Sequence, residues 1–549
     1  MSEQHKKHLF AAVVLAVVAL LVWQATGKHS TETPGLAEQQ NQSTEAVLRR
    51  GNGPEPESLN PQNSRTDPAF NLARDLFEGL LTHAPNGDLV PGVATSWDIS
   101  EDGLTYTFHL RPDARWSNGD PVVASDFVYS FRRLADPSTA AFYAQNMAPV
   151  VNGSAILSGE MDASELGVEA PDPATFVVYL VTPTPYLLDL LTHPSMYPVN
   201  AAAIDAHGKD YGRPGNLVSN GAFVLEEWVV GAYISVRRND HYWGNQGNRI
   251  DRVIFYNTSD DSAELKRYRA GELDFTYTIP LQQFRWIKEN LADEFRVHPY
   301  LTTYYYGLNL RKPPFKDSPQ LRQALAMSID RELLTEKITG VGELPAYGWV
   351  PPGTSNYTPQ SFAWAGMDAA QRNARAKQLY AQAGYGPENP AQVEIRYNTA
   401  ETHQRIAVAV ASMWKDVLGV ETTLVNEEFQ VLIQHIRQGE ITQAFRSSWI
   451  GDYNDAQTFA VFFQSDFDLN LSGYNNPAYD ALLAQASREN DLAKRRGLLE
   501  QAESLMLADT PVIPMYFHVS RHLVKPWVKD WQDNIMNLQY SRHLSLQRD

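Results

Sequence analysis

A lone cation and a lone carboxylate stand six positions apart in the stretch FRSSWIGDYNDAQTF, residues 445–459. Arg446 and Asp452 lie among aromatic and small residues, with Trp449 and Tyr453 between and beside them. A carboxylate among aromatic rings is partly desolvated, which strengthens a charge-assisted hydrogen bond to an ammonium group. Two interpretations follow: the pair binds the two ends of a zwitterionic ligand, or Asp452 caps a helix and Arg446 is a solvated charge.

The capping interpretation has other candidates in the same stretch. Asn454 or Asp455 can cap a helix predicted to begin at residue 456, which leaves Asp452 free for a ligand. If residues 446–452 are extended, the even offset places Arg446 and Asp452 on one face of a strand and Trp449 on the other. The carboxylate of a bound peptide shifts by about 3.3 Å per residue. A site that accepts several lengths therefore needs cations at several depths.

The motifs of enzymatic chemistry are missing. The sequence contains no HExxH, no GxSxG and no GxxxxGK. Its 14 histidines are scattered without the spacing of a metal site. The paired carboxylates Glu427 and Glu428 are typical of a solvated surface, and the absence of cysteine excludes thiolate chemistry and disulfides. We expect no cofactor and no metal, and the sequence favours binding over catalysis; a peptidase remains a distant alternative.

The first residues resemble an export signal. Lys6 and Lys7 precede an unbroken apolar run at 9–23, and Ala25 and Gly27 are small residues of the kind found at cleavage sites. We expect residues 1–27 to be a cleaved signal peptide or, alternatively, a retained N-terminal membrane anchor. Residues 28–45 are polar and predict a linker. Either way the remaining chain lies outside the cytoplasm, and its net charge of −18 argues against a nucleic-acid surface.

The elements that must position these side chains are short and irregularly mixed. LTYTFHLRP alternates polar and apolar residues like a half-buried strand, and GAFVLEEWVVGAYISVRR predicts two strands around Gly231. Ser125 or Asp126 is a candidate helix N-cap, and Gly419 is a candidate C-cap. A chain of 549 residues corresponds to about three or four domain-sized units. The pattern predicts α/β lobes of mixed topology made from non-contiguous segments.

Several stretches in order along the chain resemble one protein family. They are RDLFEGLL, PGVATSWDIS, TFHLRPDARWSNGDPVVASDFVYSFRR, SNGAFVLEEWVV, RYRAGELDF, YYYGLNLRKPPFKDSPQLRQALAMSIDR and LVKPWV. Together they are similar to the extracytoplasmic solute-binding proteins of family 5, the peptide/nickel group that serves ABC importers. The resemblance implies a two-lobed periplasmic-binding-protein-like α/β fold with an additional α/β domain and hinge strands. It places lobe I at 46–78, 203–302 and 520–549, the extra domain at 79–202, and lobe II at 303–519.

The resemblance also assigns roles to the charged residues. In the oligopeptide-binding members of the family, the aspartate of a W-x-x-D-Y-N segment takes the α-ammonium group of the peptide, and here that residue is Asp452. Arg446, His403 and Lys337 match positions that face the C-termini of peptides of different length. His403 would need partial protonation for this role, which a neighbouring carboxylate favours. Each of the three has an ordinary alternative as a surface charge.

Uncharged positions complete the implied ligand site. Tyr143 and Phe429 match aromatic positions that line the peptide cavity, with Phe429 standing where a tryptophan is usual; both could equally be core residues. Trp449, Gly451 and Tyr453 flank Asp452 in the same segment. Main-chain pairing with the peptide, together with hydrated side-chain pockets, would explain tolerance of many sequences.

The chain departs from its relatives at three further positions. Arg65 and Asp67 stand where close relatives have a glutamate and an apolar residue beside the bound strand, and Gly307 replaces an acidic residue. The loss of acid and the gain of arginine should disfavour basic side chains. We expect a weaker preference for lysine-rich peptides, and equal affinity for Lys- and Glu-containing tripeptides in calorimetry would contradict this.

The expected protein is therefore an exported, monomeric receptor that captures short peptides and presents them to an inner-membrane ABC permease in the periplasm. Alternatives within the binding class are a relative specialised for murein peptides, dipeptides or an opine-like compound. A membrane-anchored peptide sensor or chaperone-like scaffold is a further alternative. Nucleic acid is not an expected partner.

Overall fold

The first packed region combines segments from both ends of the chain. In the computed structural model, which describes residues 45–439, 443–467 and 469–548, the strand order is β1-β10-β9-β8, with β1 parallel to β10 and the other pairs antiparallel. The strands are β1 (Val47–Gly51), β8 (Phe223–Val229), β9 (Tyr233–Arg238) and β10 (Arg252–Tyr256), and β8 and β9 flank Gly231 as predicted. The remaining elements are α2 (Asp67–Leu76), α6 (Ala201–His207), α7 (Asp261–Arg269), α8 (Phe284–Asn290), β17 (Val528–Lys529) and β18 (Ser545–Leu546).

The second region has an antiparallel sheet in the order β4-β5-β7-β6. The alternation of LTYTFHLRP is confirmed, because Tyr106, Phe108 and Leu110 of β5 are buried while their neighbours are half-buried. Its elements are β4 (Ala94–Ile99), β5 (Thr105–Leu110), β6 (Val168–Asp172), β7 (Thr175–Tyr179), α3 (Ala124–Ala135), α4 (Gly153–Leu157) and α5 (Leu187–Leu190), and the hairpin β2 (Leu81–His83) with β3 (Leu89–Pro91) leads into it.

Helix α3 begins two residues earlier than the N-cap candidates predicted. Val123 occupies the N-cap position, and its backbone N–H donates to the Asp126 carboxylate at 2.9 Å. Asp126 thus stabilises the helix start from inside the first turn, where an acidic side chain also favours the helix dipole. The sequence correctly predicted a helix start here, but Asp126 is the residue that binds the N-cap, and Val123 is the N-cap itself.

The third region is built on a mixed sheet of strand order β12-β16-β11-β15-β13-β14. Helix α12 covers it through Ile406, Val410, Trp414 and Leu418, whose spacing of four residues gives one buried stripe, and it ends at Gly419 with φ of 74° as predicted. The strands are β11 (Phe295–Leu308), β12 (Leu344–Pro345), β13 (Gln392–Asn398), β14 (Glu421–Glu427), β15 (Ala444–Ile450) and β16 (Val512–Leu523). The helices are α9 (Pro319–Met327), α10 (Arg331–Leu333), the π-helix η7 (Leu334–Thr339), α11 (Ala369–Gln382), α12 (Glu401–Leu418), α13 (Phe429–Gln438), α14 (Gln457–Ala460), α15 (Pro477–Ala486) and α16 (Leu492–Asp509).

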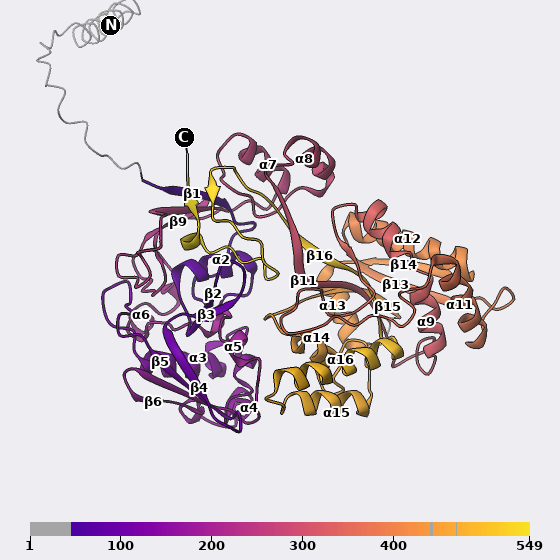
Figure 1. Cartoon of the computed structure of the whole chain (residues 1–549), viewed down its shortest axis with the longest axis horizontal. Coiled ribbons are helices and arrows are strands. Elements are labelled where there is room, and N and C mark those ends of the chain that lie inside the picture. Colours follow the sequence, from indigo (N-terminus) through magenta and orange to yellow (C-terminus); the bar gives the residue numbers. More distant parts are fainter. Residues whose placement is uncertain (1–44, 440–442, 468, 549) are drawn as a thin grey trace, which may run out of the picture. The chain divides into compact units, whose positions relative to one another are not determined.

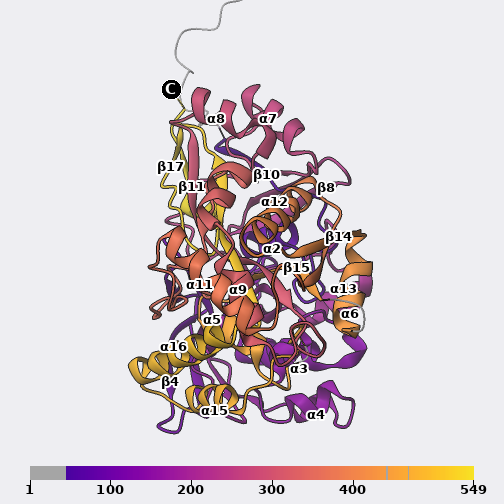
Figure 2. The same ribbon diagram turned by 90° about the vertical axis from the view of Figure 1, so that its right-hand side faces the viewer.

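Two long strands run from the first region into the third. The 14-residue strand β11 pairs antiparallel with the 12-residue strand β16, and Figure 1 shows the pair linking the two sides of the described chain. At the first-region end, Phe275 forms isolated bridges to Arg50 and to Val524. Figure 2 views the third region from its outer side, with α9, α11 and α12 toward the viewer. In its sheet β15 lies between β11 and β13, so the segment after β15 begins at the centre of the third sheet.

The core follows the same division. Separate clusters of buried apolar residues fill the first and second regions, and the largest cluster fills the third. Two residues cross this division: Tyr453 of the third region packs into the cluster of the second, and Ile535, between β17 and β18, packs into the cluster of the third. Within the described ranges, no helix has the length and apolar character needed to cross a bilayer. The expected signal or anchor at 1–27 and nearly all of the linker lie outside the described residues.

Candidate functional site

Asp452 lies just beyond the end of β15. The strand ends at Ile450, so the condition that residues 446–452 are extended holds only up to 450, and the shared-face argument does not reach Asp452. Gly451 donates its N–H to the Leu301 carbonyl at 2.8 Å, and a Cβ at this position would lie 2.5 Å from the Leu301 side chain. The close approach requires glycine, and it fixes where the chain leaves the sheet.

Asp452 is spared from helix capping. Asp455 accepts a hydrogen bond from the Gln457 N–H at 2.8 Å, and its two carboxylate oxygens also accept from Arg495 of α16 at 2.7 and 2.8 Å. The Asp452 backbone N–H donates to Thr458 at 3.3 Å, while its carboxylate has no cationic partner among the residues that the structure describes. The local fold is therefore complete without the Asp452 side chain.

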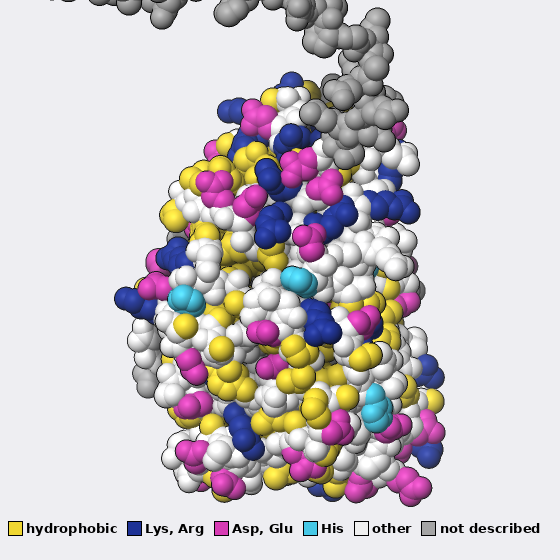
Figure 3. All heavy atoms as spheres, turned by 90° about the vertical axis from the view of Figure 1, so that its left-hand side faces the viewer, with side chains coloured by type: hydrophobic (Ala, Val, Ile, Leu, Met, Phe, Trp, Pro, Cys, Tyr) yellow, Lys and Arg dark blue, Asp and Glu magenta, His cyan; other side chains and the backbone are white. Residues whose placement is uncertain are grey.

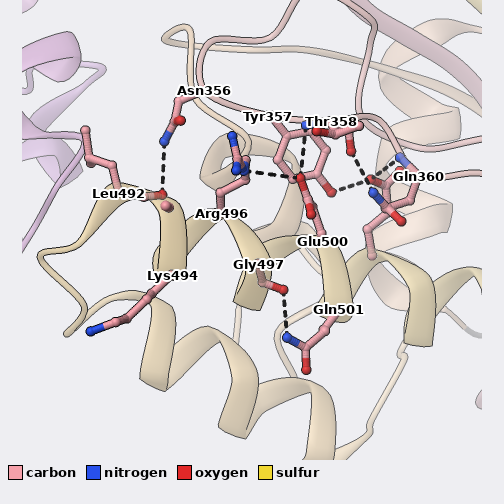
Figure 4. A network of polar contacts seen from close by, with 12 residues as sticks. Asn356, Tyr357, Thr358, Gln360, Leu492, Lys494, Arg496, Gly497, Glu500 and Gln501 are labelled. Atoms are coloured by element: carbon pink, nitrogen blue, oxygen red, sulfur yellow. Dashed lines mark hydrogen bonds and ion pairs between the residues drawn. The ribbon is translucent and has the colours of Figure 1, made fainter.

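A polar network holds the segment of Asp452 against α16. Asn454 accepts from the Ser355 N–H at 3.0 Å, and the loop that follows Ser355 is fastened to the helix. In Figure 4, Asn356 donates to the Leu492 carbonyl and the Thr358 N–H donates to Glu500, at 3.1 and 3.2 Å. With two anchors on α16, the backbone around Asp452 is set before any ligand arrives.

The Asp452 side chain is reached by water but is also partly desolvated by the surrounding protein. Its side chain is exposed to water, yet the surrounding protein excludes enough solvent to raise the pKa of its carboxyl to about 6. Asp67, at the first turn of α2, is similarly exposed, and desolvation raises the pKa of its carboxyl too. Both properties are expected for carboxylates on the wall of a concave surface.

Tyr143 brings the second region to the same place. Burial raises the pKa of its hydroxyl, and the negative charges of Asp452, Asp67 and Glu57 raise it further. Its ring packs on His193 and Phe70, with centroids 4.4 and 5.8 Å away. The negative charges of three carboxylates therefore act on one tyrosine hydroxyl, which makes this point attractive to a cation.

Arg446 is the cation on β15, and it has no ion-pair partner in the described part of the chain. Its Nη1 donates to the Asn398 side chain at 3.2 Å, and its guanidinium lies over the Tyr304 ring, 4.8 Å from the centroid. The Nε of this half-buried side chain has no hydrogen-bond partner. Arg446 pairs with Tyr306 and Ser448 pairs with Tyr304 in the register of β15 and β11, so these side chains share one face of the sheet. An under-satisfied guanidinium of this kind can bind a carboxylate.

His403 lies beside Arg446 but is not a cation. Its Nδ1 is 3.2 Å from the Tyr304 hydroxyl, and burial together with the Arg446 charge lowers its pKa to about 4. Burial and the neighbouring arginine account for this lowered pKa, and partial protonation of His403 beside a bound carboxylate stays a prediction. A neutral imidazole can still donate one hydrogen bond to a carboxylate.

Lys337 and Phe429 are both exposed. Lys337 lies on η7, which packs against α12, the helix that carries His403. Phe429 is the first residue of α13 and leaves 47% of its surface open to water. A single exposed aromatic side chain is ordinary on a protein surface, so a ligand role for Phe429 stays a prediction.

The aromatic neighbours of Asp452 make structural contacts. Trp449 donates its indole N–H to the Thr458 carbonyl at 2.8 Å and packs on Phe462, on the side of β15 opposite Arg446. Tyr453 stacks on Tyr186 of the second region, with centroids 5.0 Å apart and planes 3° from parallel. These contacts anchor the segment, and a ligand role for either ring stays a prediction.

The three residues that differ from the relatives are not equally exposed to solvent. Arg65 and Asp67 are exposed at the start of α2. Gly307 is buried on β11 opposite Phe445, and an added Cβ would lie 2.2 Å from the Phe445 ring. Phe445 occupies the space that a side chain at 307 would need, so glycine is required here, and the weaker preference for basic ligands stays a prediction.

Sequence reasoning missed the supporting residues. Tyr304 and Asn398 hold Arg446, and Glu57 adds charge near Tyr143. The run of three tyrosines at 304–306 was the available signal for Tyr304. No group of three or more metal-ligating side chains occurs in the described ranges. On the face seen in Figure 3, basic and acidic side chains are interspersed and form no continuous basic area.

Comparison with known proteins gives a consistent result. Residues 88–470 match the model of the family described as bacterial extracellular solute-binding proteins, family 5. The chain is 39% identical to the periplasmic oligopeptide-binding protein OppA of Escherichia coli, over 97% of this chain and 98% of the relative. It is 40% identical to the periplasmic murein peptide-binding protein MppA of the same organism, with the same coverage.

Solved structures extend the match. The unliganded open form of MppA aligns with a TM-score of 0.83 at 40% identity, covering 92% of this chain and 98% of that one. The complex of Haemophilus influenzae OppA with the peptide RPPGFSPFR aligns with a TM-score of 0.76 at 38% identity, covering 92% and 99%.

Proposed function

The chain belongs to family 5 of the bacterial extracellular solute-binding proteins, and we propose that it captures short peptides by their termini and delivers them to an ABC importer. The two-lobed α/β fold of the family is the fold described above. Relatives at about 39% identity over nearly the whole chain are oligopeptide- and murein peptide-binding proteins. They are binding proteins located outside the cytoplasm, and we extend this to a periplasmic receptor without covalent chemistry.

One observation carries the proposal. The Asp452 carboxylate has no cationic partner in the described chain, its backbone is fixed, and it lies near Tyr143 from another region. An ammonium group bound there would exchange its water for a charge-assisted hydrogen bond in a crowded site. Such a bond is worth more after closure has removed the remaining water.

The opposite end of the ligand would meet Arg446, with His403 and Lys337 for other lengths. The Cα atoms of Arg446 and Asp452 are at most roughly 20 Å apart, given about 3.3 Å per extended residue. An extended tripeptide spans about 10 Å, so the long arginine side chain can cover part of the difference. We assign Tyr143, Phe429, Trp449, Gly451, Tyr453, Arg65 and Asp67 to the walls of this site.

We also propose that closure moves two bodies about β11 and β16. The first body is lobe I, residues 46–78, 203–302 and 520–549, together with the extra domain 79–202, and the second is lobe II, residues 303–519. The higher TM-score against an open form supports an open arrangement here. The inner-membrane permease and the monomeric state belong to the same proposal.

A murein peptide is the second candidate ligand, favoured by 40% identity to MppA and by the TM-score of 0.83 to its open form. Native mass spectrometry of freshly purified protein separates the candidates. A distribution of peptide masses of different composition supports a general peptide receptor, whereas a single mass matching a murein peptide supports the specialised one. Protein that carries no peptide and shows no heat on titration with tripeptides or murein tripeptide would contradict both.

A further inference from the structure

A cavity opens beside the residues assigned to the proposed ligand site. Its volume is about 550 Å³, and its walls come from the segment before α2, from α3 and the turn after it, and from residues around α6. Among the lining residues, Arg65, Arg133, Lys209 and Arg213 are basic and only Glu57 is acidic. The protein as a whole has a net charge of −18, so a cavity with several basic side chains indicates a binding site for an anionic group.

The positive charges are largely uncompensated. Arg65, Lys209 and Arg213 make no ion pair with a described residue, and Arg213 lies over the Trp228 ring, 4.7 Å from its centroid. Arg133 donates to the Gln62 side-chain oxygen, which is neutral. Asp205 and Asp210 occur in the same stretch as Lys209 but are not part of the cavity wall.

The single acid of the cavity is already engaged. Both carboxylate oxygens of Glu57 accept hydrogen bonds, from the Arg65 backbone N–H and from the Thr66 hydroxyl. Glu57 therefore shapes the loop before α2 and leaves the guanidinium and ammonium groups free to bind an anion.

The cavity adjoins the point that the proposed function assigns to the amino end of the ligand. Phe142 lines the cavity and packs edge-on against Tyr143 at 5.1 Å, and Glu57 acts on the same tyrosine as Asp452. Phe142 leaves 56% of its surface exposed. Together with Trp228, it gives the cavity apolar walls suited to the methylene groups of a side chain.

We propose that this cavity binds the carboxylate side chain of an acidic residue at the first or second position of the captured peptide. The inference rests on the proposed function, since Asp452 must hold the amino end for the neighbouring side chain to reach the cavity. With this cavity, the receptor would bind both termini of its ligand and would also prefer an acidic side chain near the amino end.

Calorimetry with matched tripeptides tests the inference. The pairs are Ala-Glu-Ala with Ala-Gln-Ala, Glu-Ala-Ala with Gln-Ala-Ala, and, as an internal control, Ala-Ala-Glu with Ala-Ala-Gln. We expect the glutamate peptide to bind about fivefold more tightly in at least one of the first two pairs, as for several partly exposed charges acting together. The advantage should shrink at high salt and be absent in the third pair.

Variants then assign the preference to the cavity. The double variant Lys209→Gln/Arg213→Gln should bind the glutamine peptides like the wild-type protein and lose the glutamate advantage. Lys377→Gln, an exposed site on α11 outside the cavity, should retain it. Equal affinities within the first two pairs, or an unchanged advantage in the double variant, overturn the inference.

Two controls separate the possible failures. If none of the neutral peptides binds, the proposed function fails, and the inference falls with it. If free glutarate raises the melting temperature of the wild-type protein as much as the glutamate peptide does, the cavity is an independent anion site and the inference is wrong. No shift with glutarate, together with the peptide preference, supports it.

Discussion

Replacement of Asp452 by asparagine is the perturbation with the clearest expected outcome. The variant keeps the shape of the side chain and the hydrogen bond from the Asp452 N–H, which involves only the backbone at this position. It removes the charge that an α-ammonium group would meet. Loss of one partner of a charge pair that ligand binding buries costs about 2–5 kcal/mol. Because Asp452 is exposed before closure, we expect the lower part of that range, about 2–3 kcal/mol, or roughly 30- to 150-fold in Kd.

The pH dependence supplies a second, independent magnitude. With a pKa of about 6, the Asp452 carboxyl is about 90% ionised at pH 7 and about 10% ionised at pH 5. The ammonium group of a peptide keeps its proton throughout this interval. Affinity of the wild-type protein should therefore fall about tenfold from pH 7 to pH 5, while His403, with a pKa of about 4, stays mainly neutral.

Other groups titrate in the same window, and the variant controls for them. Burial and the charge of Asp455 raise the pKa of Asp189 to about 7, and burial raises that of Glu503 to about 7. Both are present in the wild-type protein and in Asp452→Asn. The difference between the two pH profiles, measured by calorimetry with trialanine, therefore isolates residue 452. Parallel profiles would refute the assignment of the amino end to Asp452.

The stability of Asp452→Asn has an expected sign as well. A carboxyl whose pKa is raised in the folded state binds a proton more readily there than in the unfolded chain, so its contribution to stability is lost as pH rises through about 6. Asparagine does not ionise, so the variant does not lose this stability at pH 7. The melting temperature of the peptide-free variant at pH 7 should equal or exceed that of the wild-type protein, and a lower value would mean that Asp452 has a structural role.

Three further predictions concern other residues. Arg446→Gln should weaken binding of trialanine by about 2 kcal/mol or more in calorimetry, with no further loss when the peptide is C-amidated; a full additional loss would place its carboxylate elsewhere. Arg495→Ala leaves the half-buried Asp455 carboxylate unpaired and should lower the free energy of unfolding by about 3 kcal/mol in urea titration, and a change below about 1 kcal/mol would contradict the geometry. Gly307→Ala forces a Cβ against Phe445 and should destabilise by about 1–3 kcal/mol in the same assay, without changing the ratio of affinities for Lys- and Glu-containing tripeptides.

Local patterns predicted local structure well. The alternation around Tyr106, the paired strands about Gly231 and the C-cap at Gly419 depend on neighbouring residues, and all three are confirmed. Such features follow from side-chain period and backbone preference, which a single sequence contains. The N-cap expected at Asn454 or Asp455 is wrong, because α14 begins at Gln457 with Ala456 as its N-cap; Asp455 instead accepts the N–H of the first helical residue.

The features that the sequence could not show arise where distant segments meet. The protonation of His403 depends on Arg446, 43 positions away, and the room at Gly307 depends on the ring of Phe445 across the sheet. The stacking of Tyr453 on Tyr186 joins two regions that share no local pattern. The end of β15 depends on the contact between Gly451 and Leu301, which lie far apart in the sequence, so residue spacing could not predict it.

The measurement that tests the central claim most directly is a blocking series on the wild-type protein. Trialanine, its N-acetylated form, its C-amidated form and the doubly blocked peptide are titrated by calorimetry at pH 7. If charges fixed at Asp452 and Arg446 hold the two termini, each single block should weaken binding by about 30-fold or more, and the doubly blocked peptide should bind weakest. If the doubly blocked peptide binds as tightly as free trialanine, the ligand is held by something other than its ends, and the account is contradicted.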